Sequence, residues 1–333
     1  MPMPISPLSV RAGGQAVSIG ECMVELAREP DGRFGLAFGG DTFNTAAYMA
    51  RAGIEVAYAT ALGDDPYSSG IMATARAENV STDLIITLPG RMPGLYLIET
   101  TAQGERSFWY WRDRAAAREL FECTGAANVI EAIAAARLVY FSGITLSLYT
   151  AKAIDSMADA VAAARAQGAV IAMDSNYRPR GWGGDLNRAR ATFARFWALA
   201  DIALPTFDDE QVLWGDNMPA DTTNRLCDLG ITEIVVKQGS DGARVRAGGQ
   251  DLVVPCPAPV NAVDTTAAGD SFNAGYLARR LLGDGPADAA ILAHRLAGVV
   301  IQHRGAMVPK AATDVVLASA GERSRQSLSS PQA

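Results

Sequence analysis

One short segment near the C-terminal end has the residue types that phosphoryl transfer needs. Asp264-Thr265-Thr266-Ala267-Ala268-Gly269-Asp270 is a turn of small residues that runs straight into a predicted helix. Its backbone N–H groups can face an anion, and the positive end of the helix points at the turn. Asp270 stands in the first helical turn, where its carboxylate could take a proton from a hydroxyl nucleophile. The alternative is an Asp that only caps the helix.

A second segment, Gly39-Gly40-Asp41-Thr42-Phe43-Asn44, precedes another predicted helix. Two glycines let the backbone approach a ligand closely. Asp41 and Asn44 have side chains suited to sugar hydroxyls. The alternative is a glycine turn followed by a helix cap at Asp41 or Thr42.

Arginines on two segments indicate a binding site for an anion. Tyr110 and Arg112 lie two residues apart on a predicted strand and therefore share one face, and Tyr96 on the partner strand could face the same space. A guanidinium fork matches planar oxyanions such as a carboxylate or a phosphate. Asn176-Tyr177-Arg178-Pro179-Arg180 follows another predicted strand and adds two arginines. The alternatives are an exposed Arg on a half-buried strand, and surface arginines that balance an acidic protein.

A fourth segment, Lys237-Gln238-Gly239-Ser240-Asp241-Gly242, follows a predicted strand and is compatible with a nucleotide loop. The Walker pattern is absent from it. Because glycine-rich turns are common, this segment does not identify a nucleotide site by itself.

Alternating strands and helices must position these segments. Short apolar runs predict strands at 16–19, 56–61, 138–142, 169–174, 202–205 and 233–237. Longer periodic patterns predict helices at 42–52, 68–78, 126–136, 151–167 and 186–200. This alternation predicts an α/β protein with a mostly parallel sheet and helices on both faces. Ligands on such sheets bind at the carboxyl ends of the strands, where the segments above fall.

One region departs from this alternation. The runs 95–101 and 106–113, joined by Ala102-Gln103-Gly104-Glu105, are typical of a hairpin, and 35–38 is predicted to pair with it. Without crossover helices, these strands are expected to form a separate small sheet. It would be either a lid over the site or a contact between subunits.

Composition limits the function classes. The chain has 333 residues, of which 49% are hydrophobic, enough for one large domain. A net charge of −7 and the lack of a basic cluster exclude nucleic acid as an expected partner. No apolar run reaches the ~20 residues that span a bilayer. Four scattered cysteines fit a reducing cytoplasm, and the polar segments 1–15 and 321–333 are expected to be flexible tails.

Taken together, the segments resemble the PfkB, or ribokinase-like, family of carbohydrate kinases, over about residues 16–315. The family's order is kept by Gly39-Gly40, Gly63-Asp64-Asp65 with Gly70, Lys237-x-Gly239-x-x-Gly242 and Asp264 to Asp270. Further matches resemble the branch of the family that acts on 2-keto-3-deoxygluconate: Gly20-Glu21-Cys22-Met23-Val24-Glu25-Leu26, Gly39-Gly40-Asp41-Thr42, Pro93-Gly94-Leu95-Tyr96, Tyr110-Trp111-Arg112, Asn176-Tyr177-Arg178-Pro179-Arg180 and Arg304-Gly305-Ala306.

The resemblance implies a ribokinase-like three-layer α/β/α domain with a β-sheet lid from about 33–40 and 94–113. It implies ATP-dependent phosphorylation of the C6 hydroxyl of 2-keto-3-deoxygluconate, with Mg²⁺ and a monovalent cation as candidate cofactors. Asp270 matches the catalytic base, and the backbone of Ala267, Ala268, Gly269 and Asp270 matches the anion hole. The remaining matched positions are Gly39, Gly40, Asp41 and Asn44 for sugar hydroxyls, Tyr96, Tyr110, Arg112 and Arg178 for the acid end of the sugar, and Asn176, Lys237, Gly239, Ser240, Gly242 and Asn273 for the nucleotide.

The chain departs from the family pattern at two places. Most of the family has Gly where Ala267 stands, and a Cβ limits positive φ, so the turn is expected to adopt a conformation that Ala tolerates. The family's Asn-x-x-Glu appears as Thr206-Phe207-Asp208-Asp209, with Glu210 next. Asp209 or Glu210 is expected to reach the metal through water.

Other functions remain open from the sequence. A fructokinase or a 5-dehydro-2-deoxygluconate kinase would share the signature. A nucleoside kinase could stack a base on the aromatic run 108–111, and a silent sugar-binding protein could keep the fold without the reaction. The expected partners are a sugar acid and ATP, with neither nucleic acid nor membrane. A homo-oligomer is also expected, because an exposed small sheet invites pairing.

Overall fold

The computed structural model describes residues 8, 11, 13–29, 31–100, 106–258 and 260–317. The predicted hairpin turn at 102–105 and the tail at 321–333 lie outside the described residues, as does most of 1–15. Every helix in the described part of the chain is too short or too polar to span a membrane.

The described residues form a large sheet of nine strands in the order β13-β12-β11-β10-β9-β8-β1-β4-β5. Neighbours from β5 to β11 are parallel, whereas β12 and β13 add an antiparallel edge. In chain order the strands are β1 (Ala16–Ile19), β4 (Val56–Leu62), β5 (Ile85–Thr87), β8 (Leu138–Ser142), β9 (Val170–Asp174), β10 (Ile202–Ala203), β11 (Glu233–Lys237), β12 (Ala243–Ala247) and β13 (Gln250–Val254).

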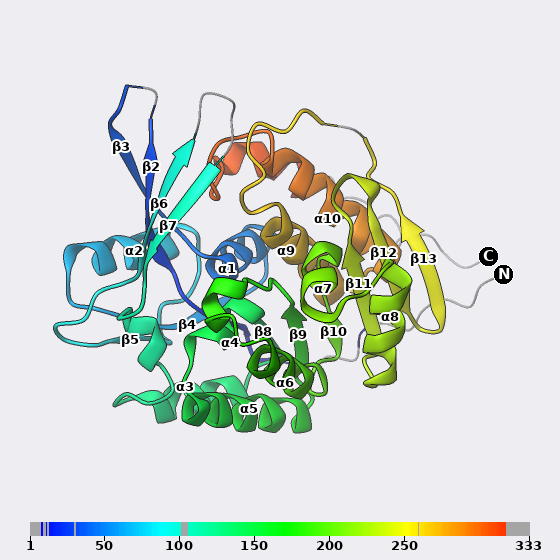
Figure 1. The fold of residues 1–333 in the computed structure, drawn as a ribbon, viewed down its shortest axis with the longest axis horizontal. Helices are drawn as coiled ribbons and strands as arrows, with labels where there is room; N and C mark the ends of the chain where they lie inside the picture. Colours follow the sequence, from blue (N-terminus) through cyan, green and yellow to red (C-terminus); the bar gives the residue numbers. More distant parts are fainter. Residues whose placement is uncertain are drawn as a thin grey trace.

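Helices cover both faces of this sheet (Figure 1). One face carries α1 (Asp41–Arg51), α2 (Pro66–Ala77), α9 (Ala268–Leu281) and α10 (Pro286–Val300). The other carries α3 (Ala126–Ala134), α4 (Gly143–Leu148), α5 (Ala151–Ala166), α6 (Leu186–Trp197), α7 (Phe207–Trp214) and α8 (Pro219–Asp228). Short 3₁₀ turns are η1 (Ala116–Glu119), η2 (Pro179–Trp182) and η3 (Gly239–Asp241).

Two hydrophobic cores, one on each face, follow from the alternation of side chains along the strands. On β8, Val139 and Phe141 pack into the core under α3 to α8, while Leu138 and Tyr140 pack under α1, α2, α9 and α10. Strands buried on both faces read as continuous apolar runs, which is why they could be located in the sequence. The three-layer prediction is confirmed.

A second sheet of four strands, here called the lid sheet, stands apart from the main sheet (Figure 1). Its order is β3-β2-β6-β7, with β2 (Met23–Arg28), β3 (Phe34–Gly39), β6 (Leu95–Thr100) and β7 (Arg106–Trp111). The antiparallel pairing of β6 with β7 is confirmed.

The predicted pairing of 35–38 with this hairpin is wrong. β3 pairs with β2, and β2 inserts between β3 and β6. Strand β2 was not predicted from the sequence, because Glu25 interrupts its apolar pattern. In the structure Glu25 lies opposite Tyr96, whose hydroxyl donates a hydrogen bond to it.

Two short connections join the lid sheet to the main sheet. Gly20, Glu21 and Cys22 lead from β1 into β2, and Gly40 leads from β3 into α1. A Cβ on Gly40 would lie 2.0 Å from the backbone oxygen of Glu21, so only glycine lets the two connections pass each other. The segment predicted to bind sugar therefore lies at the junction of the two sheets.

Candidate active site

Polar residues end three parallel strands of the main sheet and meet at one edge. Ser142 is the last residue of β8, Asp174 of β9 and Lys237 of β11. Because the carboxyl ends of parallel strands share an edge, the three side chains lie on the same side of the molecule as the start of α9. This is the edge where α/β proteins bind ligands.

The turn before α9 is held by Asp264. Its carboxylate accepts hydrogen bonds from the backbone N–H of Thr266 at 2.9 Å and of Gly305 at 2.7 Å. Ala267 caps the helix with φ +60°, which is the left-handed conformation. The Cβ at this position therefore costs about 1 kcal/mol relative to glycine, a strain of the kind found at functional turns. The backbone N–H of Ala268 donates to Thr265 O at 3.2 Å.

Asp270 is a buried carboxylate in the first turn of α9. Its Oδ2 accepts a hydrogen bond from Asn44 Nδ2 at 2.8 Å, which joins α9 to the glycine segment at the start of α1. Burial, with the nearby charges of Asp41 and Asp174, raises the pKa of Asp270 to about 7, against the hydrogen bond from Asn44 and the charge of Lys237. A carboxylate that titrates near neutral pH is suited to accept a proton from a hydroxyl.

Two more buried carboxylates surround Asp270, and each accepts a hydrogen bond from an asparagine. Asn176 Nδ2 donates to Asp41 at 2.8 Å, and Ser142 Oγ donates to the same oxygen at 2.5 Å. Burial raises the pKa of Asp41. Asn273 Nδ2 donates to Asp174 at 2.6 Å. Each of the three acids thus accepts a hydrogen bond from one asparagine amide. These neutral donors allow the acids to lie close together without a separate cation for each.

Lys237 supplies a positive charge to this cluster. Its Nζ donates to Asp174 at 2.8 Å and to Asn273 Oδ1 at 3.0 Å. The same ammonium lies 3.6 Å from the point where a Cβ on Gly269 would stand, so it sits beside the N-terminal turn of α9. An anion at that helix end would meet both the backbone N–H groups and the ammonium.

The sugar-side residues predicted from the sequence lie together. A Cβ on Gly39 would lie 3.1 Å from the Tyr96 hydroxyl and 3.5 Å from Asn44 Oδ1. The rings of Tyr96 and Tyr110 lie 6.0 Å apart on the inner face of the lid sheet. A short path therefore leads from Asp270 through Asn44 to the tyrosines.

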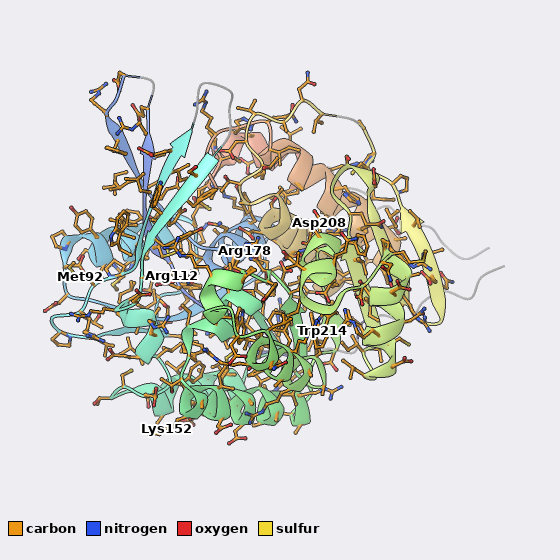
Figure 2. The ribbon with its side chains drawn as sticks, in the orientation of Figure 1. Met92, Arg112, Lys152, Arg178, Asp208 and Trp214 are labelled. Carbon is orange, nitrogen blue, oxygen red and sulfur yellow. The ribbon has the colours of Figure 1, made fainter. Side chains whose placement is uncertain are left out.

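Three arginines gather around Tyr110. The charges of Arg112, Arg178 and Arg180 all act to lower the pKa of Tyr110, although burial raises it overall. The Arg180 guanidinium lies 5.7 Å from the centre of the Tyr110 ring. In Figure 2, Arg112 lies at the foot of β7 and Arg178 toward the middle of the molecule. The charges of the two arginines named from the sequence both act on Tyr110, and so does the charge of Arg180.

Each of the two predicted arginines already has an acidic neighbour. Arg112 forms an ion pair with Glu21, and Arg178 Nη1 lies 2.9 Å from Asp209 Oδ1. Glu21, Asp174 and Ser142 were not predicted from the sequence as site residues. Ser142 and Asp174 had a usable signal, since each is a polar residue that ends a fully apolar strand.

A cavity of about 610 Å³ opens next to Lys237 and the start of α9. It is lined by four of the predicted nucleotide residues, Lys237, Gly239, Ser240 and Gly242. The other lining residues are mostly apolar and include Phe272, Ala297 and Ile301. Asn176 and Asn273 are not among the lining residues, and both amides donate hydrogen bonds to buried carboxylates.

The two residues expected to reach a metal point in different directions. Asp209 accepts from Tyr177 N–H at 3.2 Å and from Arg178. Glu210 is fully buried beside Arg225, 2.5 Å away, and burial raises its pKa to about 7. Among the described residues, no group of three or more His, Cys, Asp or Glu side chains could hold a metal ion.

A parallel sheet with a buried carboxylate, a helix N-terminus and a cavity at its carboxyl edge is an arrangement that a small-molecule phosphotransferase could use. A family model described as "pfkB family carbohydrate kinase" matches residues 14–313. The chain belongs to the pfkB family of carbohydrate kinases.

Individual proteins of known name are also similar to this chain, and several of them share one name. The chain is 42% identical over 299 residues to the 2-dehydro-3-deoxygluconokinase of Dickeya dadantii, covering 87% of this chain and 96% of that protein. It is 41% identical over 302 residues to the enzyme of the same name from Escherichia coli K12, covering 88% and 97%. The solved structure of 2-dehydro-3-deoxygluconokinase from Thermotoga maritima superposes with a TM-score of 0.80 at 21% identity, covering 92% of this chain and 99% of that one.

Proposed function

We propose that this kinase transfers the γ-phosphoryl group of ATP to the C6 hydroxyl of 2-keto-3-deoxygluconate, giving the 6-phosphate. The substrate, also called 2-dehydro-3-deoxygluconate, is a sugar acid. The observation that carries the proposal is the gathering of Arg112, Arg178 and Arg180 around Tyr110, beside the glycine segment that leads to Asp270. A neutral sugar would offer these guanidinium groups no oxyanion to bind. The relatives that are 41–42% identical support the same substrate.

In the proposed mechanism, the sugar lies with its carboxylate toward the arginines and its C6 hydroxyl toward Asp270. Asp270 holds that hydroxyl in line with the γ-phosphate and accepts its proton. Asn44 orients the Asp270 carboxylate through the 2.8 Å hydrogen bond. General-base assistance of this kind contributes roughly 10²- to 10⁴-fold.

The start of α9 and Lys237 are placed to stabilise charge on the transferred group. The transition state of phosphoryl transfer is loose, so the protein acts mainly by positioning and by electrostatics. Ala268 and Gly269 at the start of α9 line the cavity, and Lys237 is held beside them by Asp174 and Asn273. The cavity lined by Gly239, Ser240 and Gly242 is proposed for the nucleotide.

Mg²⁺ is proposed to bind with the nucleotide. Such an ion usually takes one or two carboxylates together with phosphate oxygens and water, and it neutralises charge on the phosphates. Asp209 is the carboxylate proposed to reach it through water. Glu210 is a poorer candidate because Arg225 holds it. A requirement for a monovalent cation stays a prediction.

The test is a steady-state panel with coupled detection of ADP. The substrates are 2-keto-3-deoxygluconate, its C4 epimer 2-keto-3-deoxygalactonate, fructose and ribose. We expect kcat/KM for the two sugar acids to exceed that for the neutral sugars by at least about 10², since an unmatched charge pocket rejects neutral analogues. A preference for fructose would refute the proposed substrate and support a fructokinase.

We also propose a homo-oligomer formed through the outer face of the lid sheet. Leu36, Trp109 and Trp111 are 54%, 52% and 60% exposed, and the strand register aligns Leu36 and Trp109 across the sheet. An apolar face of this kind marks a protein contact. Light scattering should show that the double variant W109S/W111S is smaller than the wild type; an unchanged mass would refute this contact.

The cytoplasm is the proposed compartment, where the four free thiols stay reduced.

A further inference from the structure

Arg112, which is proposed to meet the sugar carboxylate, is paired with a carboxylate of the protein. Arg112 Nη2 contacts Glu21 Oε2, and the two side chains are 19% and 1% exposed. Among the described residues, no second hydrogen-bond donor contacts either oxygen of Glu21. Arg112 is therefore the group that balances this buried carboxylate directly. The charge of Arg118 acts on it from farther away.

A glycine makes room for this pair. A Cβ on Gly94 would lie 2.6 Å from Glu21 Oε1 and 3.0 Å from Arg112 Cβ. Its φ is not in the left-handed region, so the reason for glycine here is space and not backbone conformation. The Pro93-Gly94 step before β6, to which the sequence alone gives no role, is explained by the close approach of these two side chains.

The two partners come from different parts of the fold. Glu21 follows β1 of the main sheet, and its backbone oxygen is packed against Gly40. Arg112 directly follows β7 of the lid sheet. The backbone of Glu21 is thus packed at the junction with the main sheet, and its ion pair with Arg112 restricts where that side chain can lie at the foot of the lid sheet.

We propose that Glu21 is a positioning residue that orients the Arg112 guanidinium for the carboxylate of the sugar acid. This inference rests on the proposed function. A guanidinium presents donors along more than one edge, so a carboxylate on one edge leaves another edge for a second oxyanion. Glu21 contacts the buried Nη2 of Arg112, and in this proposal another edge of the guanidinium binds the sugar carboxylate. Orientation by a fixed partner matters because bidentate recognition depends on the plane of the fork.

The experiment measures KM and kcat for 2-keto-3-deoxygluconate and for ATP in four variants. Glu21→Gln keeps the shape and removes the charge, Gly94→Ala crowds the pair without changing either partner, and Arg112→Gln removes the guanidinium. We expect each to raise KM for the sugar acid at least about tenfold, with kcat within threefold and KM for ATP unchanged, because the interaction is equal in ground and transition state. In the double variant E21Q/R112Q, KM should equal that of Arg112→Gln within twofold, since Glu21 acts only through Arg112.

Glu78→Gln is the matched control. Glu78 follows the last residue of α2 and also forms a buried ion pair with an arginine, Arg51, at 2.8 Å. It is far in the sequence from both Glu21 and Arg112. The substitution should lower thermal stability and leave KM for the sugar acid within twofold. This separates a positioning role from the general loss of a buried pair.

The results distinguish this inference from the proposed function. A wild-type enzyme inactive on 2-keto-3-deoxygluconate overturns the proposed function and this inference with it. An active wild type with unchanged KM in Glu21→Gln, or with multiplying effects in the double variant, overturns this inference alone. If Arg112→Gln does not fold, Gly94→Ala decides, because it keeps both charged groups: an unchanged KM in Gly94→Ala refutes the positioning role.

Discussion

Replacing Asp270 with asparagine should have opposite effects on activity and on stability. The substitution removes the proposed base, so kcat should fall by roughly 10²- to 10⁴-fold while the sugar still binds. It also removes a buried charge near Asp41 and Asp174. The amide oxygen of the introduced side chain can still accept the hydrogen bond from Asn44, so the fold keeps that contact.

The size of the stability effect follows from the titration of Asp270. Its pKa is raised from 3.8 to about 7 in the folded protein. For an acid whose pKa is raised on folding, ionisation disfavours the folded state, so the penalty is absent below about pH 4 and complete above about pH 7. Each pKa unit is about 1.4 kcal/mol, so the penalty at pH 8 is at most about 4 kcal/mol. The variant should therefore be more stable than the wild type at pH 8 by up to this amount, and the gain should vanish near pH 4.

Urea unfolding at a series of pH values between 4 and 8 measures the free energy of unfolding of both proteins, and the ADP-coupled assay measures kcat. Asp284→Asn is a suitable control for any general effect of removing a carboxylate, because Asp284 pairs with Arg279 at 2.6 Å and its loss should destabilise at pH 8. The reasoning fails if Asp270→Asn is less stable than the wild type at pH 8, or if its gain does not change with pH. Near-normal kcat would refute the assignment of the base.

Three further outcomes are expected. In the wild type, kcat/KM should fall as pH drops through about 7, because Asp270 must be ionised to accept a proton; a flat profile between pH 6 and 8 would contradict this. Ala267→Gly should raise the free energy of unfolding by roughly 0.5–1 kcal/mol in urea titrations, because it relieves the positive φ of +60° and only part of the gain is lost to chain entropy; a loss of stability would show that the turn is not strained. Gly298→Leu should raise KM for ATP at least about tenfold and leave KM for the sugar acid unchanged, since Gly298 lines the cavity; equal effects on both substrates would place the nucleotide elsewhere.

Much of the main sheet could be predicted from the sequence, because its strands are buried on both faces. The ends of β1, β8 and β11 agree with the predicted ranges 16–19, 138–142 and 233–237. The lid sheet was harder. One of its faces is exposed, and β2 carries Glu25 on its inner face, so periodicity alone did not reveal the strand or its place between β3 and β6.

The site divides in a similar way. Backbone features, such as the glycine pair at 39–40 and the turn before α9, were visible because only certain residues allow those conformations. Side-chain pairs across long distances in sequence were not visible. Nothing in the sequence joins Glu21 to Arg112, or Asp209 to Arg178, because these pairings depend on how the two sheets meet. The prediction that Ala267 would occupy a conformation that alanine readily tolerates is wrong, because its φ is +60°, in the left-handed region that favours glycine.

The connectivity of the lid sheet indicates when this sheet forms during folding. Its two strand pairs, β2 with β3 and β6 with β7, are separated in sequence by α1, β4, α2 and β5, and the parallel pairing of β2 with β6 joins them. That pairing closes a long loop, whose entropy is offset only once the intervening elements have docked. The lid sheet has a small buried cluster of its own, Met23, Tyr96 and Ile98. The backbone amides of the lid sheet should therefore exchange with solvent by a local unfolding that requires less free energy than the unfolding that exposes β1, β8 and β9. During folding, the lid sheet should form after the main sheet.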